Sequence, residues 1–184
     1  MIKVKIQIRL LFIFISIVSI SCNRQMILQT VDKLDLNKYQ GKWYEIARLP
    51  NNFEKGLTAV TATYSLNSNG KVNVLNQGIK SDNKLKSING TAWVPDKNYP
   101  GRLKVRFFWP FSGKYYVIKI DNNYRYALVG SPSRKFLWVL SKDIEMPDDV
   151  YDEYLELAKE VGFDVENLVT VDQRVNRKGN DLVN

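Results

Sequence analysis

The side chains that most often carry out acid–base or nucleophilic chemistry are nearly absent from this chain. Its 184 residues include no histidine and one cysteine, Cys22. Without histidine, a Ser–His–Asp triad, an imidazole acid–base pair and a histidine-based zinc site are excluded. Cys22 lies before the regular pattern of the chain begins, so it is not expected to be a nucleophile inside a folded core. We therefore expect no enzyme, no metal site and no cofactor.

Glu45 is the one ionisable side chain that strand alternation turns towards an apolar interior. It follows Trp43 by two residues and should lie on the same face of the strand. A lone carboxylate in an apolar cup could contact a lipid headgroup. The alternative is an ion pair with a basic residue at the rim of the cup. A single carboxylate without a partner acid or base gives little support for catalysis.

Aromatic side chains dominate the set that alternation places inward. In residues 103–109, Lys104 and Arg106 should face water, which turns the intervening side chains to the other face. Lys119 should likewise face water, which turns Tyr116 to the inner face of residues 115–120. The resulting inward set of aromatic and polar residues is Tyr64, Asn76, Phe107, Trp109, Tyr116 and Trp138. Aromatic walls with a few polar groups are typical of a ligand cavity, and a filled aromatic core is the alternative that alternation leaves open.

Short strands separated by turn signals must position these side chains. After a first strand that begins near Trp43, the pattern predicts strands over residues 58–66, 71–77, 85–94, 103–109, 115–120, 124–129 and 136–140. The sequence NSNG at residues 67–70 is a strong hairpin signal. This even spacing of eight or nine strands predicts an all-β barrel or sandwich.

One helix interrupts the β pattern near the C-terminus. Pro147 fits a first helical turn, and the two aspartates after it favour the positive end of the helix dipole. An apolar face at helical spacing is formed by Val150, Tyr154, Ala158 and Val161. We expect this helix to pack on the outside of the β structure. A short edge strand should follow within residues 165–171, and residues 175–184 should form a disordered tail.

The N-terminus is typical of an export signal. Three basic residues within positions 1–9 precede an apolar run over residues 10–20, which is too short to span a membrane. The run ends at Ser21 and Cys22, as in a bacterial lipoprotein signal whose cysteine is lipidated and becomes the mature N-terminus. Ser19 stands where such signals usually have leucine. The alternatives are an ordinary secretory signal and an uncleaved anchor.

The charge of the chain gives no indication of nucleic-acid binding. Residues 1–21 hold three of the 27 basic residues and none of the 19 acidic ones, so the remaining chain is modestly positive. Its basic residues are scattered, whereas nucleic-acid binding calls for a basic stripe with exposed aromatic residues. With Cys22 as the only cysteine, core packing alone must hold the domain together.

Three segments of the chain resemble the lipocalin family, in particular bacterial outer-membrane lipocalins and apolipoprotein D. LNKYQGKWYEIARLP at residues 36–50 resembles the first lipocalin signature, and residues 124–142 resemble the second and third. ATYSLNSNGKVNVLNQ at residues 62–77 is similar to the apolipoprotein D pattern. The resemblance implies an eight-stranded antiparallel up-and-down barrel with one C-terminal helix packed on its outside. The domain would span residues 35–174, after a signal peptide (1–21) and a tether (22–34).

The resemblance also implies roles for individual residues. The ligand cup would be lined by Tyr64, Asn76, Phe107, Tyr115, Tyr116 and Trp138. Alternation agrees for all of them except Tyr115, which it places at the rim. Trp43 would close one end of the barrel, with Lys142 across its ring where the family usually has arginine. Lysine can make a cation–π contact but lacks the planar stacking of arginine.

We therefore expect a membrane-anchored lipocalin that carries a small apolar or amphipathic ligand, such as a lysophospholipid or fatty acid, in membrane maintenance or stress. The expected partners are this lipid and the outer membrane, reached on its periplasmic face through a lipid anchor at Cys22; a homodimer is left open. One alternative is a structural or interaction lipoprotein with a filled barrel. A less favoured alternative is an enzyme on the lipocalin scaffold.

Overall fold

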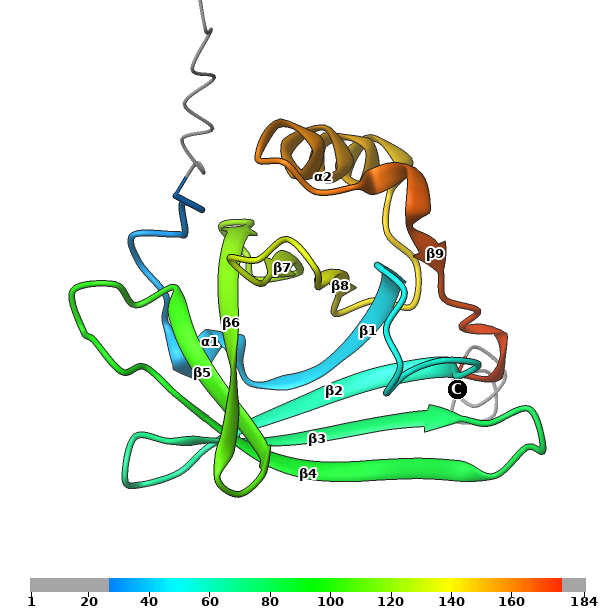
Figure 1. Ribbon diagram of the computed structural model, residues 1–184, viewed down its shortest axis with the longest axis horizontal. Helices are drawn as coiled ribbons and strands as arrows, with labels where there is room; N and C mark the ends of the chain where they lie inside the picture. The colour runs from blue at the N-terminus through cyan, green and yellow to red at the C-terminus, as the bar shows by residue number, and fades with distance from the viewer. Residues whose placement is uncertain (1–26, 177–184) are drawn as a thin grey trace, which may run out of the picture.

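A single antiparallel sheet of eight strands, closed on itself, forms the body of the protein (Figure 1). The computed structural model describes residues 27–176. The strands are β1 (Gly41–Arg48), β2 (Thr58–Leu66), β3 (Val72–Ile79), β4 (Leu85–Trp93), β5 (Arg102–Phe108), β6 (Phe111–Ile120), β7 (Tyr126–Gly130) and β8 (Leu137–Ser141). Each strand pairs with the next, and β1 pairs with both β2 and β8. The predicted up-and-down barrel is confirmed.

The connections between strands alternate between two ends of the barrel. Antiparallel order places the β1–β2, β3–β4, β5–β6 and β7–β8 connections at one end, and the other three at the opposite end. The short helix α1 (Leu36–Tyr39) precedes β1 and therefore lies at this second end. Asp35 caps α1 by accepting a hydrogen bond from the backbone N–H of Asn37. The end with the β1–β2 connection is called the open end below, and the end with α1 the closed end.

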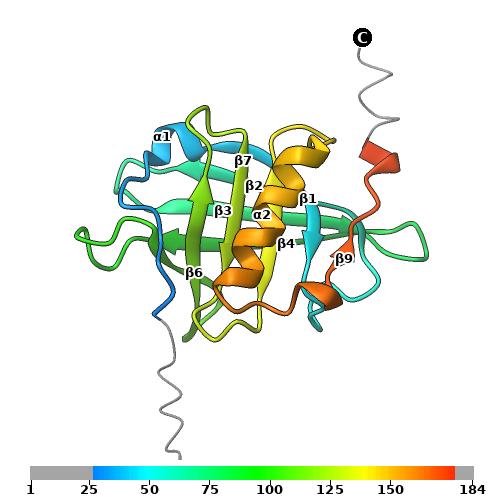
Figure 2. The same cartoon turned by 90° about the horizontal axis from the view of Figure 1, so that it is seen from above.

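A C-terminal helix covers one outer face of the barrel, as the sequence predicts (Figure 2). Helix α2 (Asp148–Glu160) begins after Pro147, and Gly162 follows its end with a φ of 91° that favours glycine. Tyr154 and Ala158 are buried in a cluster with outward-facing side chains of β7 and β8. A 3₁₀ helix, η1 (Val165–Asn167), and a short strand, β9 (Val169–Thr170), follow α2.

Residues 169–173, called the C-terminal strap here, bridge the seam between β1 and β2. These two strands pair only from Gly41 opposite Tyr64 to Tyr44 opposite Thr61. Beyond that point β9 pairs with the end of β1 instead. The buried Gln173 Nε2 donates hydrogen bonds to the backbone oxygens of Glu45 (2.8 Å) and Val60 (2.9 Å). The strap therefore satisfies polar backbone groups that the ladder leaves unpaired.

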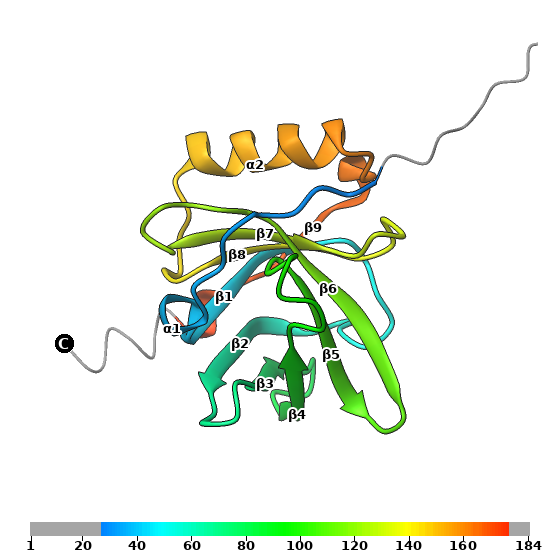
Figure 3. The ribbon, with the colours of Figure 1, turned by 90° about the vertical axis from the view of Figure 1, so that its left-hand side faces the viewer.

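The segment before α1 packs on the barrel wall (Figure 3). Leu28 is buried in the cluster beneath α2, and the Val31 N–H donates to the Val117 oxygen over 3.0 Å. The predicted signal peptide (1–21), the lipidation site Cys22 and residues 177–184 of the predicted tail lie outside the described residues. Within residues 27–176, no helix has the length and apolar character needed to cross a bilayer.

Candidate functional site

The barrel contains a cavity of about 920 Å³ that opens at the open end. This volume falls within the range of roughly 300–1,000 Å³ that is usual for small-molecule sites. Most of its wall is apolar or aromatic, and its inner part is lined by Leu36, Tyr39, Tyr64, Val72, Val74, Ala92, Leu103, Val105, Phe107, Tyr115 and Trp138. The barrel interior is therefore hollow rather than filled.

Three tyrosine hydroxyls meet in the depth of the cavity. The Tyr115 hydroxyl lies 2.7 Å from the Tyr39 hydroxyl and 2.9 Å from the Tyr64 hydroxyl. Burial raises the pKa of each of these phenols above its ordinary value. The cluster satisfies its own hydrogen bonds and supplies a small polar area in an otherwise apolar space. Tyr39, which the sequence analysis did not single out, joins it because α1 crosses the closed end.

Trp43 and Lys142 lie together at the closed end. Trp43 is fully buried, and its indole Nε1 donates to the backbone oxygen of Tyr39 over 2.8 Å. Lys142 Nζ lies 4.9 Å from the centroid of the Trp43 ring and donates to the backbone oxygen of Gln40. Burial lowers the pKa of Lys142. Gly41 passes this lysine with a φ of 97°, where a side chain would be strained.

The residues that line the cavity include basic side chains but no aspartate or glutamate. The basic ones are Arg102, Lys114 and Arg134. Lys114, near the start of β6, and Arg134, in the β7–β8 connection, lie towards the open part, whereas Arg102 begins β5 next to the β4–β5 connection. The Arg102 guanidinium lies 4.2 Å from the ring centroid of Tyr99 and 5.7 Å from that of Tyr116. Its Nε is buried and has no hydrogen-bond partner in the described part of the chain. This charge distribution favours an anionic or neutral ligand group over a cationic one.

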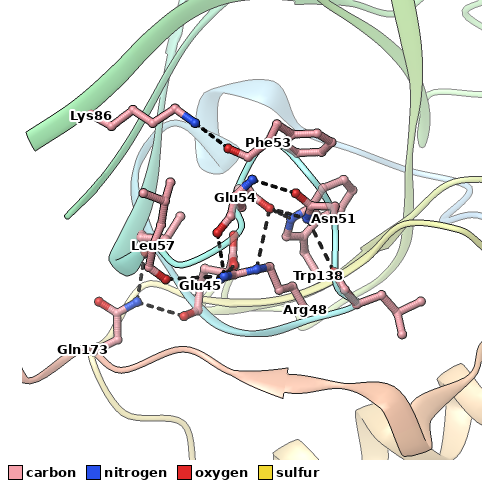
Figure 4. A network of polar contacts seen from close by, with 11 residues as sticks. Glu45, Arg48, Asn51, Phe53, Glu54, Leu57, Lys86, Trp138 and Gln173 are labelled. Carbon is pink, nitrogen blue, oxygen red and sulfur yellow. Dashed lines mark hydrogen bonds and ion pairs between the residues drawn. The ribbon is translucent and has the colours of Figure 1, made fainter. Parts of the chain in front are cut away.

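Glu45 belongs to a buried ionic network instead of the cavity lining (Figure 4). Its Oε1 lies 2.6 Å from Arg48 Nη1, and Glu54 Oε2 lies 4.0 Å from Arg48 Nε. All three side chains are buried, so two carboxyl groups share one guanidinium away from water. Burial, followed by the charge of Glu54, raises the pKa of Glu45 to about 8, against the lowering effect of Arg48.

The same network holds the β1–β2 connection, residues 49–57, against the barrel (Figure 4). Glu54 Oε2 accepts hydrogen bonds from Asn51 Nδ2 (2.6 Å) and Trp138 Nε1 (3.1 Å). Arg48 Nη2 donates to the backbone oxygen of Glu54 over 2.9 Å, and Lys86 Nζ donates to the backbone oxygen of Phe53 over 2.6 Å. Sequence reasoning missed Arg48 and Glu54, because their meeting depends on how this connection folds back over β1.

Five of the predicted ligand residues line the cavity: Tyr64, Phe107, Tyr115, Tyr116 and Trp138. Glu45, Asn76 and Trp109 do not. Asn76 shares the inward face of β3 with Val72 and Val74, and its Oδ1 is buried without a hydrogen-bond partner among the described residues. Trp109 lies in the turn between β5 and β6, where its side chain is 82% exposed.

Two β-bulges explain why alternation misplaced some of these side chains. Against β7, β6 carries an extra residue between Val117 and Lys119, which reverses the alternation there. Tyr115 therefore faces the interior, while Tyr116 packs towards α2 on the outer side as well as touching the cavity. Alternation was wrong to place Tyr115 at the rim for this reason, whereas Tyr116 still lines the cavity. A bulge between Val105 and Phe108 likewise removes Trp109 from the inward series.

The family model and the similar proteins all point to one family. The lipocalin-like domain family matches residues 34–173. The outer membrane lipoprotein Blc of Vibrio cholerae is 41% identical over 146 residues, which cover 78% of this chain and 85% of that protein. Blc of Escherichia coli K12 is 44% identical over 144 residues, covering 78% and 81%. Apolipoprotein D of Macaca fascicularis is 35% identical over 150 residues, covering 77% and 78%.

Solved structures share the fold at lower identity. Insecticyanin from the tobacco hornworm Manduca sexta has a TM-score of 0.64 at 23% identity, covering 79% of this chain and 84% of its own. Lobster apocrustacyanin A1 has a TM-score of 0.63 at 18% identity, covering 83% and 93%. With the closed barrel, its hollow interior and the match over residues 34–173, these findings show that the chain belongs to the lipocalin family.

Proposed function

We propose that this protein binds one single-chain amphipathic lipid, a fatty acid or a lysophospholipid, in its barrel cavity and carries it at the outer membrane. The observation that carries the proposal is the cavity itself: about 920 Å³, aromatic walls, and basic residues without acidic ones in its lining. Lipocalins bind small hydrophobic ligands, and the bacterial relatives are named outer membrane lipoproteins.

Apolar burial supplies most of the binding free energy in this proposal. Each methylene that leaves water for the aromatic wall contributes about 0.8 kcal/mol. The anionic group of the lipid then remains near the open part of the cavity, close to Lys114 and Arg134. Glu45 takes no part, because Arg48 already pairs with it outside the lining.

The membrane location in this proposal rests on the leader of the chain. The basic and apolar residues before Cys22, followed by diacylation of that cysteine, would hold the protein on the periplasmic face of the outer membrane. A role in membrane maintenance or stress belongs to the same proposal. The oligomeric state is a separate question, left open by the sequence, that sedimentation of the purified protein would answer.

The alternatives have less support. A lipoprotein with a filled barrel does not agree with the size of the cavity. An enzyme would have to work without histidine, and lipocalins are binding proteins. The described residues also contain no group of three or more acidic, cysteine or histidine side chains that could hold a metal ion.

Filling the cavity tests the proposal. Val105 lines it from β5, whereas the neighbouring Lys104 is exposed. Val105→Trp should displace about two methylenes of a bound chain and weaken binding of a fluorescent long-chain fatty acid about tenfold. Lys104→Trp is the matched control and should leave the affinity unchanged. Titration of the wild type should saturate at one probe per chain; absence of saturable binding would remove the proposal, as would equal affinity in Val105→Trp.

A further inference from the structure

Large apolar side chains gather around the mouth of the cavity, where they are exposed to solvent. Phe108 is 69%, Trp109 82% and Phe111 78% exposed. Phe53 and Ile27 are also exposed, and all of these residues except Trp109 line the cavity. They make up five of the nine exposed large hydrophobic residues in the described part of the chain. A cluster of exposed apolar side chains on one solvent-facing surface marks an interaction site.

The β5–β6 hairpin carries the most exposed part of this cluster beyond the neighbouring strand. Phe108 pairs with Phe111 across the hairpin, and Trp109 and Pro110 form its turn. The pairing of β6 with β7 begins only at Tyr116, so residues 111–115 have no partner on β7. Figures 2 and 3 show the hairpin reaching the same side of the molecule as the β7–β8 connection. The tip can therefore contact another surface without breaking the pairing of the barrel strands.

Charged residues are found at both ends of the barrel. The open-end connections, residues 49–57, 80–84, 109–110 and 131–136, contain five basic and two acidic residues, and residues 161–174, which lie beside Arg134 and the end of β1 at the same end, add three acidic and one basic. One of the acidic residues, Glu54, is buried in the Arg48 network. The closed-end segments, residues 67–71, 94–101, 121–125 and 142–147, contain four of each sign. The basic character is concentrated at the mouth itself, where Lys114 and Arg134 line the cavity and no acidic residue does. The mouth is therefore suited to a negatively charged surface.

The first described residue lies at this same end. Ile27 lines the mouth, and the chain there enters the barrel wall on the side of the hairpin tip (Figures 2 and 3). Cys22 is five residues earlier, a reach of at most about 18 Å even for fully extended chain. A lipid on Cys22, which belongs to the proposed function, would therefore hold the open end next to the membrane.

We propose that the mouth of the barrel docks on an anionic phospholipid surface, with Trp109 and its hairpin neighbours in the interfacial region. Aromatic side chains favour this depth, and the surrounding basic residues add attraction to anionic headgroups. The cavity then opens onto lipid, so a ligand chain passes between bilayer and barrel without crossing bulk water. This step goes beyond the proposed function, because a carrier can also collect free ligand from solution.

Vesicle binding of the unlipidated Cys22→Ser protein tests the docking. It should bind phosphatidylcholine vesicles that contain phosphatidylglycerol and bind pure phosphatidylcholine vesicles more weakly. Adding Trp109→Ser should weaken vesicle binding about tenfold. Adding Tyr99→Ser instead is the control, because Tyr99 is an exposed aromatic residue on the β4–β5 connection at the closed end. That control should bind like the parent.

Three results would overturn the docking proposal: no vesicle binding by the parent, equal binding by the Trp109→Ser variant, or equal loss in the Tyr99→Ser control. Self-association that disappears in the Trp109→Ser variant, in place of vesicle binding, would make the tip a contact between copies and would also overturn it. Fatty-acid titration is read separately. Trp109 does not line the cavity, so its substitution should leave probe affinity unchanged. If the protein binds the fatty-acid probe but not vesicles, only the docking proposal is contradicted. If it binds vesicles but not the probe, only the proposed function is contradicted.

Discussion

Arg48 lies between two buried carboxyl groups, and this arrangement changes the role of Glu45. A headgroup contact was one of two roles that the sequence left open for Glu45; the structure gives it a guanidinium partner at 2.6 Å. Through Glu54, the same guanidinium is linked to Trp138, which lines the cavity. Removing one member of a buried ionic group leaves an uncompensated charge, so such groups tolerate change poorly. The network therefore holds one residue of the cavity wall while its own charged side chains stay outside the lining.

Glu45 should make stability depend on pH. Its pKa is about 8 in the fold and near 4.5 when the chain is unfolded, so the fold prefers the protonated acid. The associated stability is complete below pH 4.5 and is lost as the pH rises through 8. Glutamine is a neutral isostere of the protonated acid. Across this pH window, the free energy of unfolding of Glu45→Gln should therefore fall less steeply than that of the wild type, by up to about 1.4 kcal/mol per pH unit. Denaturation of both proteins from pH 5 to 9 measures the difference, and a gap that stays constant with pH would contradict it.

Probe affinity provides the second readout for Glu45→Gln. Because Glu45 lies outside the cavity lining, discrimination between charged and neutral ligand headgroups should stay as in the wild type. A change in that discrimination would instead support a contact between Glu45 and the ligand headgroup.

Strand positions could be read from the sequence because turn residues mark their ends. The segment 58–66 was predicted with the bounds that β2 has, and the other strands differ by a few residues. Which face a side chain occupies could not be read with the same success. One inserted residue reverses alternation, and bulges arise from pairing between strands rather than from local sequence. Tyr115 and Trp109 were misplaced for this reason, and the Arg48 network was missed because it depends on a folded connection.

The C-terminal strap should contribute stability without affecting the ligand. Gln173→Leu removes three hydrogen bonds, one of them from Asn176, and leaves two backbone oxygens near the β1–β2 seam without their donor. Each loss should cost about 1–3 kcal/mol in the free energy of unfolding. Glu166→Gln, at an exposed position in η1, is the control and should stay within about 0.5 kcal/mol of the wild type. Denaturant unfolding measures the effect; a change in Gln173→Leu no larger than that of the control would show that the strap is dispensable.

For the molecule as a whole, the mouth, the hairpin tip and the start of the described chain share one side of the barrel (Figure 3). Helix α2 covers a side wall and leaves this opening uncovered. An anchor near residue 22 and an opening at the same end would combine attachment and exchange in one orientation. Attachment can be tested without reference to the ligand.

Cys22→Ser should release the protein from the membrane into the periplasm. Wild type should be recovered with the outer membrane and carry acyl chains on Cys22, whereas Ser21→Ala, which keeps a small residue before the cysteine, should remain anchored. Fractions should be washed with high salt, because docking through basic residues is screened by salt but a lipid anchor is not. Membrane retention of Cys22→Ser after this wash, or intact residues 1–21 on the mature protein, would contradict lipidation.

The strap also has a consequence for the time course of export. Gln173 reaches Glu45 across 128 positions of sequence, and β1 needs β8 as its neighbour. A chain that crosses a membrane from its N-terminus presents β1 long before either partner has arrived. Contacts of such large sequence separation form slowly, since the intervening chain must first be ordered. If the leader directs export as proposed, the barrel therefore cannot close during translocation, because β8 and the strap complete the surroundings of β1 only after they too have crossed.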